Sequence, residues 1–312
     1  MSDFSSAAER SWGVDFIRKF FPQRSDTITE LTDVEKVPGV LQRNNIALVR
    51  GIVPAQDRHR VFCFAHDRLV VPVDPGNNLM LYISSETSTG HETTFWLIRS
   101  VINRRVAAIA SAYFQDVAGT RDFLLPLNNL LIGQFDAAQS KPDLLVPYHQ
   151  DGAGLLRGFH MLNCWTLLYP DECGMTSPGL EFCPAPVRHT LATAAQPKSK
   201  HYGGLESDDD EIAALSRLHG TVVPSVALGD ILMFNELALH RTSTAKPSTM
   251  TKSRVSAEIR LVAANARALE ERDRSGAAYA LVSGNRIEWP SVWQLRDGSI
   301  VPVKTQSADL LD

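Results

Sequence analysis

Residues 143–152 read DLLVPYHQDG, an apolar run that ends in a histidine and an aspartate two residues apart. We interpret the run as a strand, and on a strand residues two apart point to the same face. His149 and Asp151 can therefore direct an imidazole nitrogen and a carboxylate oxygen at one point. Alone, this His-x-Asp triplet is a weak signal, because the chain has nine histidines and many acidic residues.

Short apolar runs separated by turn residues extend outward from this stretch on both sides. They are LLPLNNLLIGQF (124–135), MLNCWTLLYP (161–170), GLEFCP (179–184), GTVVPSVALGDILMFN (220–235), LALHRTS (237–243) and SRVSAEIRLVA (253–263). Six or more short strands at this spacing predict an all-β sandwich or barrel. Polar residues dominate the stretch 186–219, which is too long for a hairpin turn, so we expect a lid insert there. Its acidic run 208–211 is typical of a helix N-terminus.

The chain before residue 122 has a different pattern, and we expect residues 1–121 to form a mainly helical N-terminal support. Helices are expected over 7–21, 54–69 and 91–117, the last because its apolar residues recur at gaps of three and four. One clear strand is expected in NIALVRGIV, residues 45–53. The core would span 122–264, followed by a C-terminal extension over 265–312 with a hairpin near 296–299, all in a single domain.

Composition excludes several classes of protein. The 312 residues are 44% hydrophobic, which is enough for one large core. The charges are nearly balanced, with 31 Lys+Arg against 35 Asp+Glu, so no nucleic-acid or membrane surface is expected. We expect neither a spanning helix nor a secretory signal, because no apolar run approaches the ~20 residues of a membrane span and the N-terminus lacks a basic region before an apolar one. Four scattered cysteines fit free thiols in a reducing compartment, hence a cytoplasmic protein: Cys63, Cys164, Cys173 and Cys183.

A second histidine lies downstream, where a Gly229-Asp230 turn leads into an apolar strand and the next strand carries His240. In a sandwich, residues this far apart in sequence can be adjacent in space. Two histidines and one carboxylate suit Fe(II), and on one face of an octahedron they leave three positions open.

Arg254 and Ser256 open a further apolar strand and share one of its faces. A guanidinium grips a carboxylate with two hydrogen bonds, and a hydroxyl adds one more donor. This pair would suit the distal carboxylate of a keto-diacid cosubstrate.

The order H-Q-D-G, N-C-W, P-G-L-E-F-x-P, G-D-I-L-x-F, H-R-T-S and R-V-S, over roughly residues 122–264, resembles the phytanoyl-CoA dioxygenase family. The resemblance implies a double-stranded β-helix (jelly-roll) core with flanking helices, mainly β within an α+β chain. It also implies a dioxygenase that uses Fe(II), 2-oxoglutarate and O2 to oxidise a small molecule, with release of succinate and CO2.

The resemblance assigns roles residue by residue. His149, Asp151 and His240 would be the iron ligands. The remaining positions would hold 2-oxoglutarate: Arg254 and Ser256 at its C5 carboxylate, Thr242 close to it, Trp165 in the pocket wall and Gln134 on the strand before the metal motif. Asp151 stands where family halogenases carry Gly or Ala, so hydroxylation, desaturation or ring closure is favoured over halogenation.

Two departures from the family pattern leave alternatives open. The segment TAKPSTMTKS (244–253) lengthens the spacing from His240 to Arg254, which makes Arg260 a rival for the cosubstrate. The segment PAPVRH (184–189) replaces the family's P-G-S-H turn, so substrate contacts there need not carry over. Trp165 is as easily a core residue as part of the cosubstrate pocket.

The substrate and the reaction class also have alternatives. Basic groups near the lid suggest an anionic or polar small molecule, or else a solvated rim: Arg157, His160, Arg188, His189, Lys198, Lys200 and His201. A cupin-like dioxygenase or isomerase without 2-oxoglutarate is the rival enzyme class. A binding module without catalysis is the other.

Overall fold

The computed structural model describes residues 28–54, 57, 79–82, 97–127, 131–135, 146–154, 157–169, 172–174, 177, 179–195, 205–243, 254–275, 279–290, 292–294, 300–302 and 307–310. The expected helix over 7–21 lies outside these residues, as does almost all of the one expected over 54–69.

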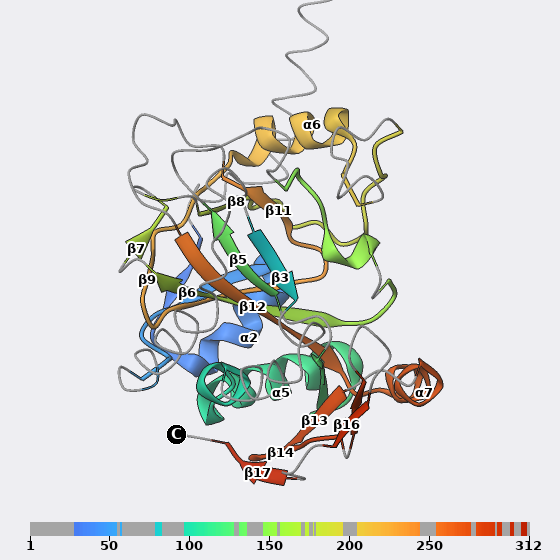
Figure 1. The fold of residues 1–312 in the computed structure, drawn as a ribbon. Coiled ribbons are helices and arrows are strands. Elements are labelled where there is room, and N and C mark those ends of the chain that lie inside the picture. Colours follow the sequence, from blue (N-terminus) through green and yellow to red (C-terminus); the bar gives the residue numbers. More distant parts are fainter. Residues whose placement is uncertain are drawn as a thin grey trace, which may run out of the picture.

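One large mixed sheet forms the centre of the molecule (Figure 1). Neighbouring strands follow the order β1 (Glu30–Leu31), β2 (Ile46–Val49), β10 (Ile231–Asn235), β6 (Met161–Tyr169), β12 (Arg254–Ala263), β4 (Phe123–Pro126), β13 (Tyr279–Ser283), β14 (Arg286–Glu288) and β17 (Ser307–Asp309). Beside this path, β5 (Leu131–Phe135) pairs with β12 and β3 (Leu79–Tyr82) pairs with β5. All pairings are antiparallel except that of β1 with β2.

A smaller sheet of β8 (Leu180–Cys183) and β11 (Leu239–Thr242) lies against one face of the large sheet. Two further pairs are β7 (Glu172–Cys173) with β9 (Val226–Ala227), and β15 (Val292–Gln294) with β16 (Ile300–Pro302). This arrangement confirms the predicted class: mainly β, with flanking helices around a double-stranded β-helix core.

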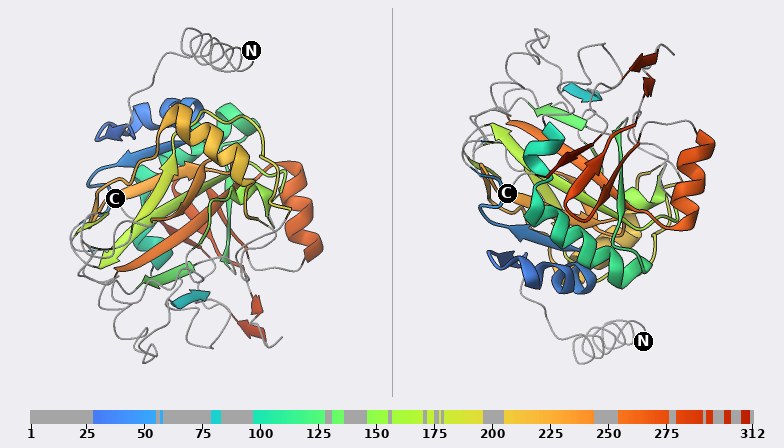
Figure 2. Two further views of the ribbon diagram at one scale, coloured as in Figure 1. Left: turned by 90° about the horizontal axis from the view of Figure 1, so that it is seen from above. Right: turned by 90° about the horizontal axis from the view of Figure 1, so that it is seen from below.

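Side-chain alternation separates the two faces of the large sheet. On β10, Ile231 and Met233 join one core cluster, while Leu232 and Phe234 join another that includes Phe182 of β8. The first cluster is covered by α2 (Val37–Asn44) and α5 (Arg104–Ala118), and the second lies inside the β-sandwich. Figure 2 shows α5 over one side of the sheet and α6 (Asp209–His219) over the other.

The expected single helix over 91–117 is wrong in its continuity, because the chain breaks at Ile102–Asn103. Residues 97–101 are helical, and α5 begins only at Arg104. Asn103 has an extended backbone, its side chain accepts a hydrogen bond from the Val106 N–H (3.0 Å) and donates one to the Ile52 carbonyl (2.9 Å). An N-cap of this kind starts a new helix while the apolar face continues, so periodicity does not reveal the break.

The other described N-terminal elements match the sequence in part. β2 confirms the strand expected in 45–53, but α2, β1 and β3 were not predicted. Asn45 ends α2 in the left-handed conformation at φ 66° and leads directly into β2. The predicted helix start at the acidic run is confirmed, since the Asp208 carboxylate caps α6 through the Asp210 and Glu211 N–H groups.

After β12, the chain continues through α7 (Ala266–Ser275) and returns to the large sheet. β13 pairs with β4, and the turn at Gly284–Asn285 connects β13 to β14. β15 and β16 pair across the segment where a hairpin was expected, although the turn itself lies outside the described residues. Among the described helices, none has the length and apolarity that crossing a membrane demands.

Candidate metal centre

The two candidate histidine ligands are joined by their backbones. The His149 N–H donates to the His240 carbonyl (3.0 Å), and the His240 N–H donates to the His149 carbonyl (3.1 Å). This antiparallel bridge pairs the backbone at His149 with β11. The side chains of two directly opposed residues point to the same side, which brings both imidazoles together.

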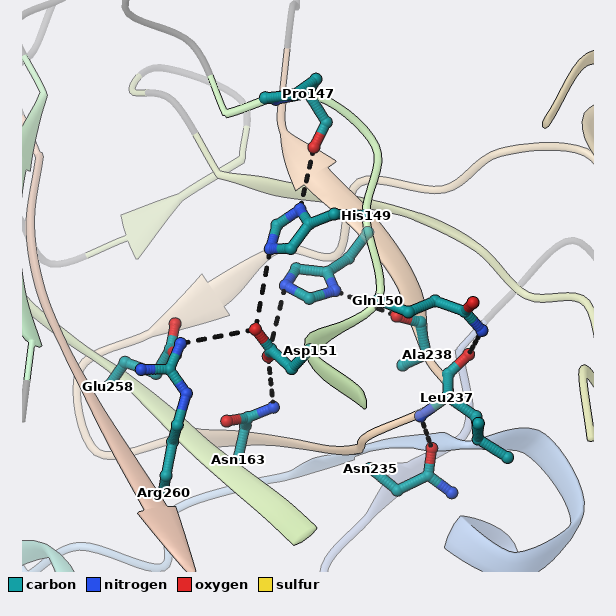
Figure 3. A network of polar contacts seen from close by, with 11 residues as sticks. Pro147, His149, Gln150, Asp151, Asn163, Asn235, Leu237, Ala238, Glu258 and Arg260 are labelled. Carbon is teal, nitrogen blue, oxygen red and sulfur yellow. Dashed lines mark hydrogen bonds and ion pairs between the residues drawn. The ribbon is translucent and has the colours of Figure 1, made fainter. Parts of the chain in front are cut away.

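Asp151 begins a short 3-10 turn, Asp151–Ala153, directly after the bridge. The Gly152 N–H donates to the Glu236 carbonyl (2.9 Å), and a Cβ at Gly152 would lie 2.9 Å from that same oxygen. Only glycine permits this close approach. The turn places the Asp151 carboxylate below the two rings (Figure 3).

The three side chains form one compact donor set. The Asp151 Oδ1 lies 3.8 Å from His149 Nε2, and its Oδ2 lies 3.9 Å from His240 Nε2. The imidazole centroids are 4.2 Å apart, and all three ligand atoms lie within 4.8 Å of one another. An ion about 2 Å from each donor fits between atoms at such separations.

Both histidines have the tautomer that metal binding requires. His149 Nδ1 lies 2.9 Å from the Pro147 carbonyl, and His240 Nδ1 lies 3.0 Å from the Ala238 carbonyl. A carbonyl only accepts, so each Nδ1 carries the proton and each Nε2 presents a lone pair to the centre.

The electrostatics favour the same protonation states. Burial lowers the pKa of His149 to about 4, with a further contribution from the adjacent His240, and burial also lowers the pKa of His240. Burial alone would raise the pKa of Asp151, but Arg260 and the two imidazoles outweigh burial and hold that pKa below its ordinary value. At neutral pH the centre has two neutral imidazoles and a carboxylate, ready to bind a cation.

The Asp151 carboxylate also has protein partners of its own (Figure 3). Asn163 on β6 donates from Nδ2 to Oδ2 (2.8 Å), and Arg260 on β12 lies with Nη2 3.5 Å from Oδ1. Arg260 forms a second ion pair with Glu258, which is buried on the same face of β12. No local motif predicted Asn163 or Glu258, and Arg260 was predicted only as a rival cosubstrate residue.

Aromatic side chains enclose His240. The Phe234 ring lies 4.6 Å from the imidazole, and the Phe182 ring stacks on it at 5.6 Å. Both phenylalanines are fully buried, so the second histidine is held in a rigid apolar wall.

Gln150, between the two ligands of the HQD motif, is buried and joins three segments. Its Nε2 donates to the Leu237 carbonyl (2.7 Å), which precedes β11, and its Oε1 accepts from the Leu191 N–H (2.7 Å). Gln150 therefore links the turn at Asp151–Ala153 to the segment before His240 and to the first residues of the expected lid insert.

Three of the expected cosubstrate residues, Arg254, Ser256 and Trp165, lie on the interior face of β6 and β12. Arg254 and Ser256 are buried. Together with Glu258 and Arg260 they occupy every second position of β12, so all four side chains share the face that reaches Asp151. The Arg254 guanidinium lies 5.3 Å above the Trp165 ring and donates to the Gly179 carbonyl (3.2 Å). Trp165 belongs to the interior core cluster, which agrees with the alternative prediction that it is a core residue.

Two further expected residues are placed by strand pairing. Thr242 is buried at the end of β11, two residues from His240, and its N–H donates to the Val146 carbonyl (3.1 Å). Gln134 pairs with Val255, between Arg254 and Ser256 in the register of β5 with β12. Because Val255 packs against the helix-covered core, this register position is on the other face of β12 from Arg254 and Ser256.

The basic residues near the lid that the structure describes do not converge on the centre. Arg188 is exposed and donates to the Gln42 carbonyl of α2, while His160 pairs with Glu236 at 3.2 Å. Arg157 and His189 are exposed. Lys198, Lys200 and His201 lie outside the described residues.

Comparisons with known proteins give similar folds but no sequence match. No family model and no curated protein matches the chain. Among solved structures, EvdO2 from Micromonospora carbonacea var. aurantiaca complexed with 2-oxoglutarate has a TM-score of 0.54 at 18% identity, covering 78% of this chain and 94% of that one. The epimerase SnoN in complex with Fe3+, alpha ketoglutarate and nogalamycin RO has a TM-score of 0.51 at 14% identity, covering 73% and 83%.

AviO1 from Streptomyces viridochromogenes Tue57 is similar to the same degree, with a TM-score of 0.51 at 16% identity and coverage of 74% and 96%. At these identities the comparisons establish a shared fold. They agree with the jelly-roll core that the sequence motifs imply.

Proposed function

We propose that this chain is a non-haem Fe(II)- and 2-oxoglutarate-dependent dioxygenase that oxidises a small molecule. The observation that carries the proposal is the donor set of His149, Asp151 and His240, whose ligand atoms converge while both Nδ1 atoms are held by backbone carbonyls. Two imidazoles and one carboxylate are the ligands of the non-haem Fe(II) oxygenases.

Each residue has a defined part. His149 and His240 present neutral Nε2 lone pairs, and Asp151 supplies the charge that favours a divalent cation. A cation held by these three side chains would keep its remaining coordination positions for cosubstrate and O2. When bound there, Fe(II) with 2-oxoglutarate supplies oxidation of a C–H bond by O2, with release of succinate and CO2.

Arg254 and Ser256 would hold the distal carboxylate of 2-oxoglutarate. A buried guanidinium beside a hydroxyl on the same strand face supports this role, because the two groups can donate together to one carboxylate. Thr242 and Trp165 would complete the cosubstrate pocket around it. Gln134, also expected there, has less support because it pairs with Val255, which packs against the helix-covered core. Arg260 is the weaker candidate, since Asp151 and Glu258 already engage it.

The fold comparisons support a small-molecule substrate. SnoN is described with nogalamycin RO together with Fe3+ and alpha ketoglutarate, and EvdO2 with 2-oxoglutarate. We propose a polar small molecule of secondary metabolism that is hydroxylated, desaturated or cyclised. The described basic residues give little support to an anionic one, because Arg188 and His160 are engaged elsewhere.

We also propose that residues 1–312 form one oxygenase domain, in which 1–121 support a core over 122–264, residues 186–219 form a lid and 265–312 extend the sheet. The pairing of β13 with β4 supports continuity between the core and the extension. The buried free thiols of Cys164, Cys173 and Cys183 support a reducing, cytoplasmic location.

The test is turnover of 2-oxoglutarate. Protein loaded anaerobically with Fe(II) is mixed with 2-oxoglutarate and O2, and succinate is measured with and without a metabolite panel. We expect slow succinate formation that panel members accelerate and that His149→Ala and His240→Ala abolish. Oxidation of a panel metabolite without succinate would instead establish the cupin-like class, and metal-loaded protein that neither binds nor consumes 2-oxoglutarate would refute the proposal.

A further inference from the structure

We propose that Asn163 and Arg260 form a clamp that fixes the Asp151 carboxylate as a metal ligand and thereby sets the affinity of the centre for divalent cations. The inference rests on the proposed metal centre and assigns it two positioning residues.

The register of the sheet places the two residues side by side. On the central strand pair, Arg260 of β12 lies directly opposite Asn163 of β6. Directly opposed residues point to the same face, and this face is the sandwich interior, since their neighbours Cys164, Ile259 and Leu261 pack into the helix-covered core. The two donors therefore come from two adjacent strands that the backbone ladder fixes.

Each donor engages a different oxygen of Asp151. Asn163 Nδ2 donates to Oδ2 at 2.8 Å, and Arg260 Nη2 lies 3.5 Å from Oδ1. The imidazoles lie on another side of the same carboxylate, with His149 Nε2 3.8 Å from Oδ1 and His240 Nε2 3.9 Å from Oδ2. A carboxylate has about four lone-pair positions, so one protein donor on each oxygen leaves the others available to a cation beside the histidines (Figure 3).

Two fixed donors restrict rotation of the carboxylate about its terminal bond. A cation between the imidazoles then meets the carboxylate already oriented, without the entropy cost of ordering it. Hydrogen-bond partners of metal ligands typically change metal affinity by about 10- to 100-fold.

The charge of Arg260 is balanced by Glu258. The guanidinium contacts both carboxylates, Asp151 and Glu258, on the interior face of β12. When all three groups are ionised, Arg260, Glu258 and Asp151 together carry one negative charge, so Asp151 keeps its attraction for a divalent cation. A role limited to satisfying buried polar groups would predict lower stability in a variant but the same metal affinity once the protein is folded.

The experiment measures anaerobic binding of Mn(II), a redox-stable probe, by calorimetry and by electron paramagnetic resonance of the bound ion. Two variants weaken the clamp from opposite sides. Asn163→Ala removes the donor to Oδ2, and Arg260→Lys keeps the positive charge for Glu258 but removes the guanidinium whose Nη2 contacts both carboxylates. The matched control is Thr166→Val on β6, whose hydroxyl donates to the Asp230 carbonyl away from the centre.

We expect each clamp variant to bind Mn(II) about 10- to 100-fold more weakly, with an altered resonance signal, and the control to bind like the unaltered protein. Thermal unfolding establishes that each variant is folded, and either clamp variant alone decides the question if the other fails to fold. Folded clamp variants that bind within threefold of the unaltered protein would overturn the clamp alone. No Mn(II) binding by the unaltered protein would overturn the metal centre and the clamp with it.

Discussion

Replacing Arg254 with glutamine should remove most of the affinity for 2-oxoglutarate without weakening the fold. The guanidinium is 2% exposed, and burial lowers its pKa from 12.5 to about 10. A difference of this size corresponds to about 3 kcal/mol against the charged form, since one pKa unit equals about 1.4 kcal/mol. We expect a bound carboxylate to offset this cost by pairing with the guanidinium.

The expected loss of affinity for 2-oxoglutarate follows from the same free energy of burying the charged guanidinium. Without the buried cation, the cosubstrate carboxylate loses about 3 kcal/mol of pairing, which corresponds to a dissociation constant roughly a hundredfold higher. In apo protein the variant should unfold at the same temperature as the unaltered chain or higher, because the change removes an unfavourable buried charge.

The assay is anaerobic calorimetric titration of 2-oxoglutarate into protein saturated with Mn(II). Arg260→Lys is the control: at saturating Mn(II) it should bind 2-oxoglutarate like the unaltered protein, because Arg260 serves the metal ligand. If Arg254→Gln bound 2-oxoglutarate normally while Arg260→Lys lost it, the roles of the two arginines would be exchanged.

Three further predictions concern the surroundings of the centre. Ser256→Ala removes one neutral hydroxyl donor and should raise the 2-oxoglutarate dissociation constant roughly two- to tenfold in the same titration; an unchanged constant would exclude a contact. Gln150→Ala leaves buried backbone groups without their partners, so it should lower the free energy of urea unfolding by about 1–3 kcal/mol. An unfolding curve with an unaltered midpoint and slope would contradict these hydrogen bonds. The hydrogen bond with Glu236 raises the pKa of His160, so the pair stabilises the fold below the unfolded pKa and loses this contribution as pH rises through the raised folded value. Glu236→Gln should therefore lower the free energy of urea unfolding by less than about 1 kcal/mol at about pH 5.5 and by almost nothing at about pH 8.5. An equal decrease at both pH values would exclude the pair.

The core strands were predictable because short apolar runs are separated from one another by turn residues. β6, β8, β10, β11 and β12 each lie within a run recognised from the sequence. The pattern of a strand says nothing about which edge it joins, so the pairing of the C-terminal β13 with β4 could not be anticipated. The break at Asn103 escaped for a related reason, since the residues on both sides keep the same apolar face.

The candidate centre was predictable to the extent that its residues lie in local motifs. His149 and Asp151 are two residues apart, and His240 follows a recognisable Gly-Asp turn. Asn163 and Glu258 were missed because their positions depend on the register of β6 against β12, which short-range patterns do not specify. A signal was nevertheless present: a glutamate and an arginine two residues apart within the apolar strand 254–263 indicate a polar task on a buried face.

The most direct test of the proposed iron centre is the weak visible charge-transfer band that forms when Fe(II) and 2-oxoglutarate bind together under anaerobic conditions. We expect the band to saturate at one equivalent of each and to be absent in His149→Ala and His240→Ala. If no band forms in the unaltered protein, or if it forms equally in both histidine variants, His149, Asp151 and His240 are not the iron centre of an oxygenase.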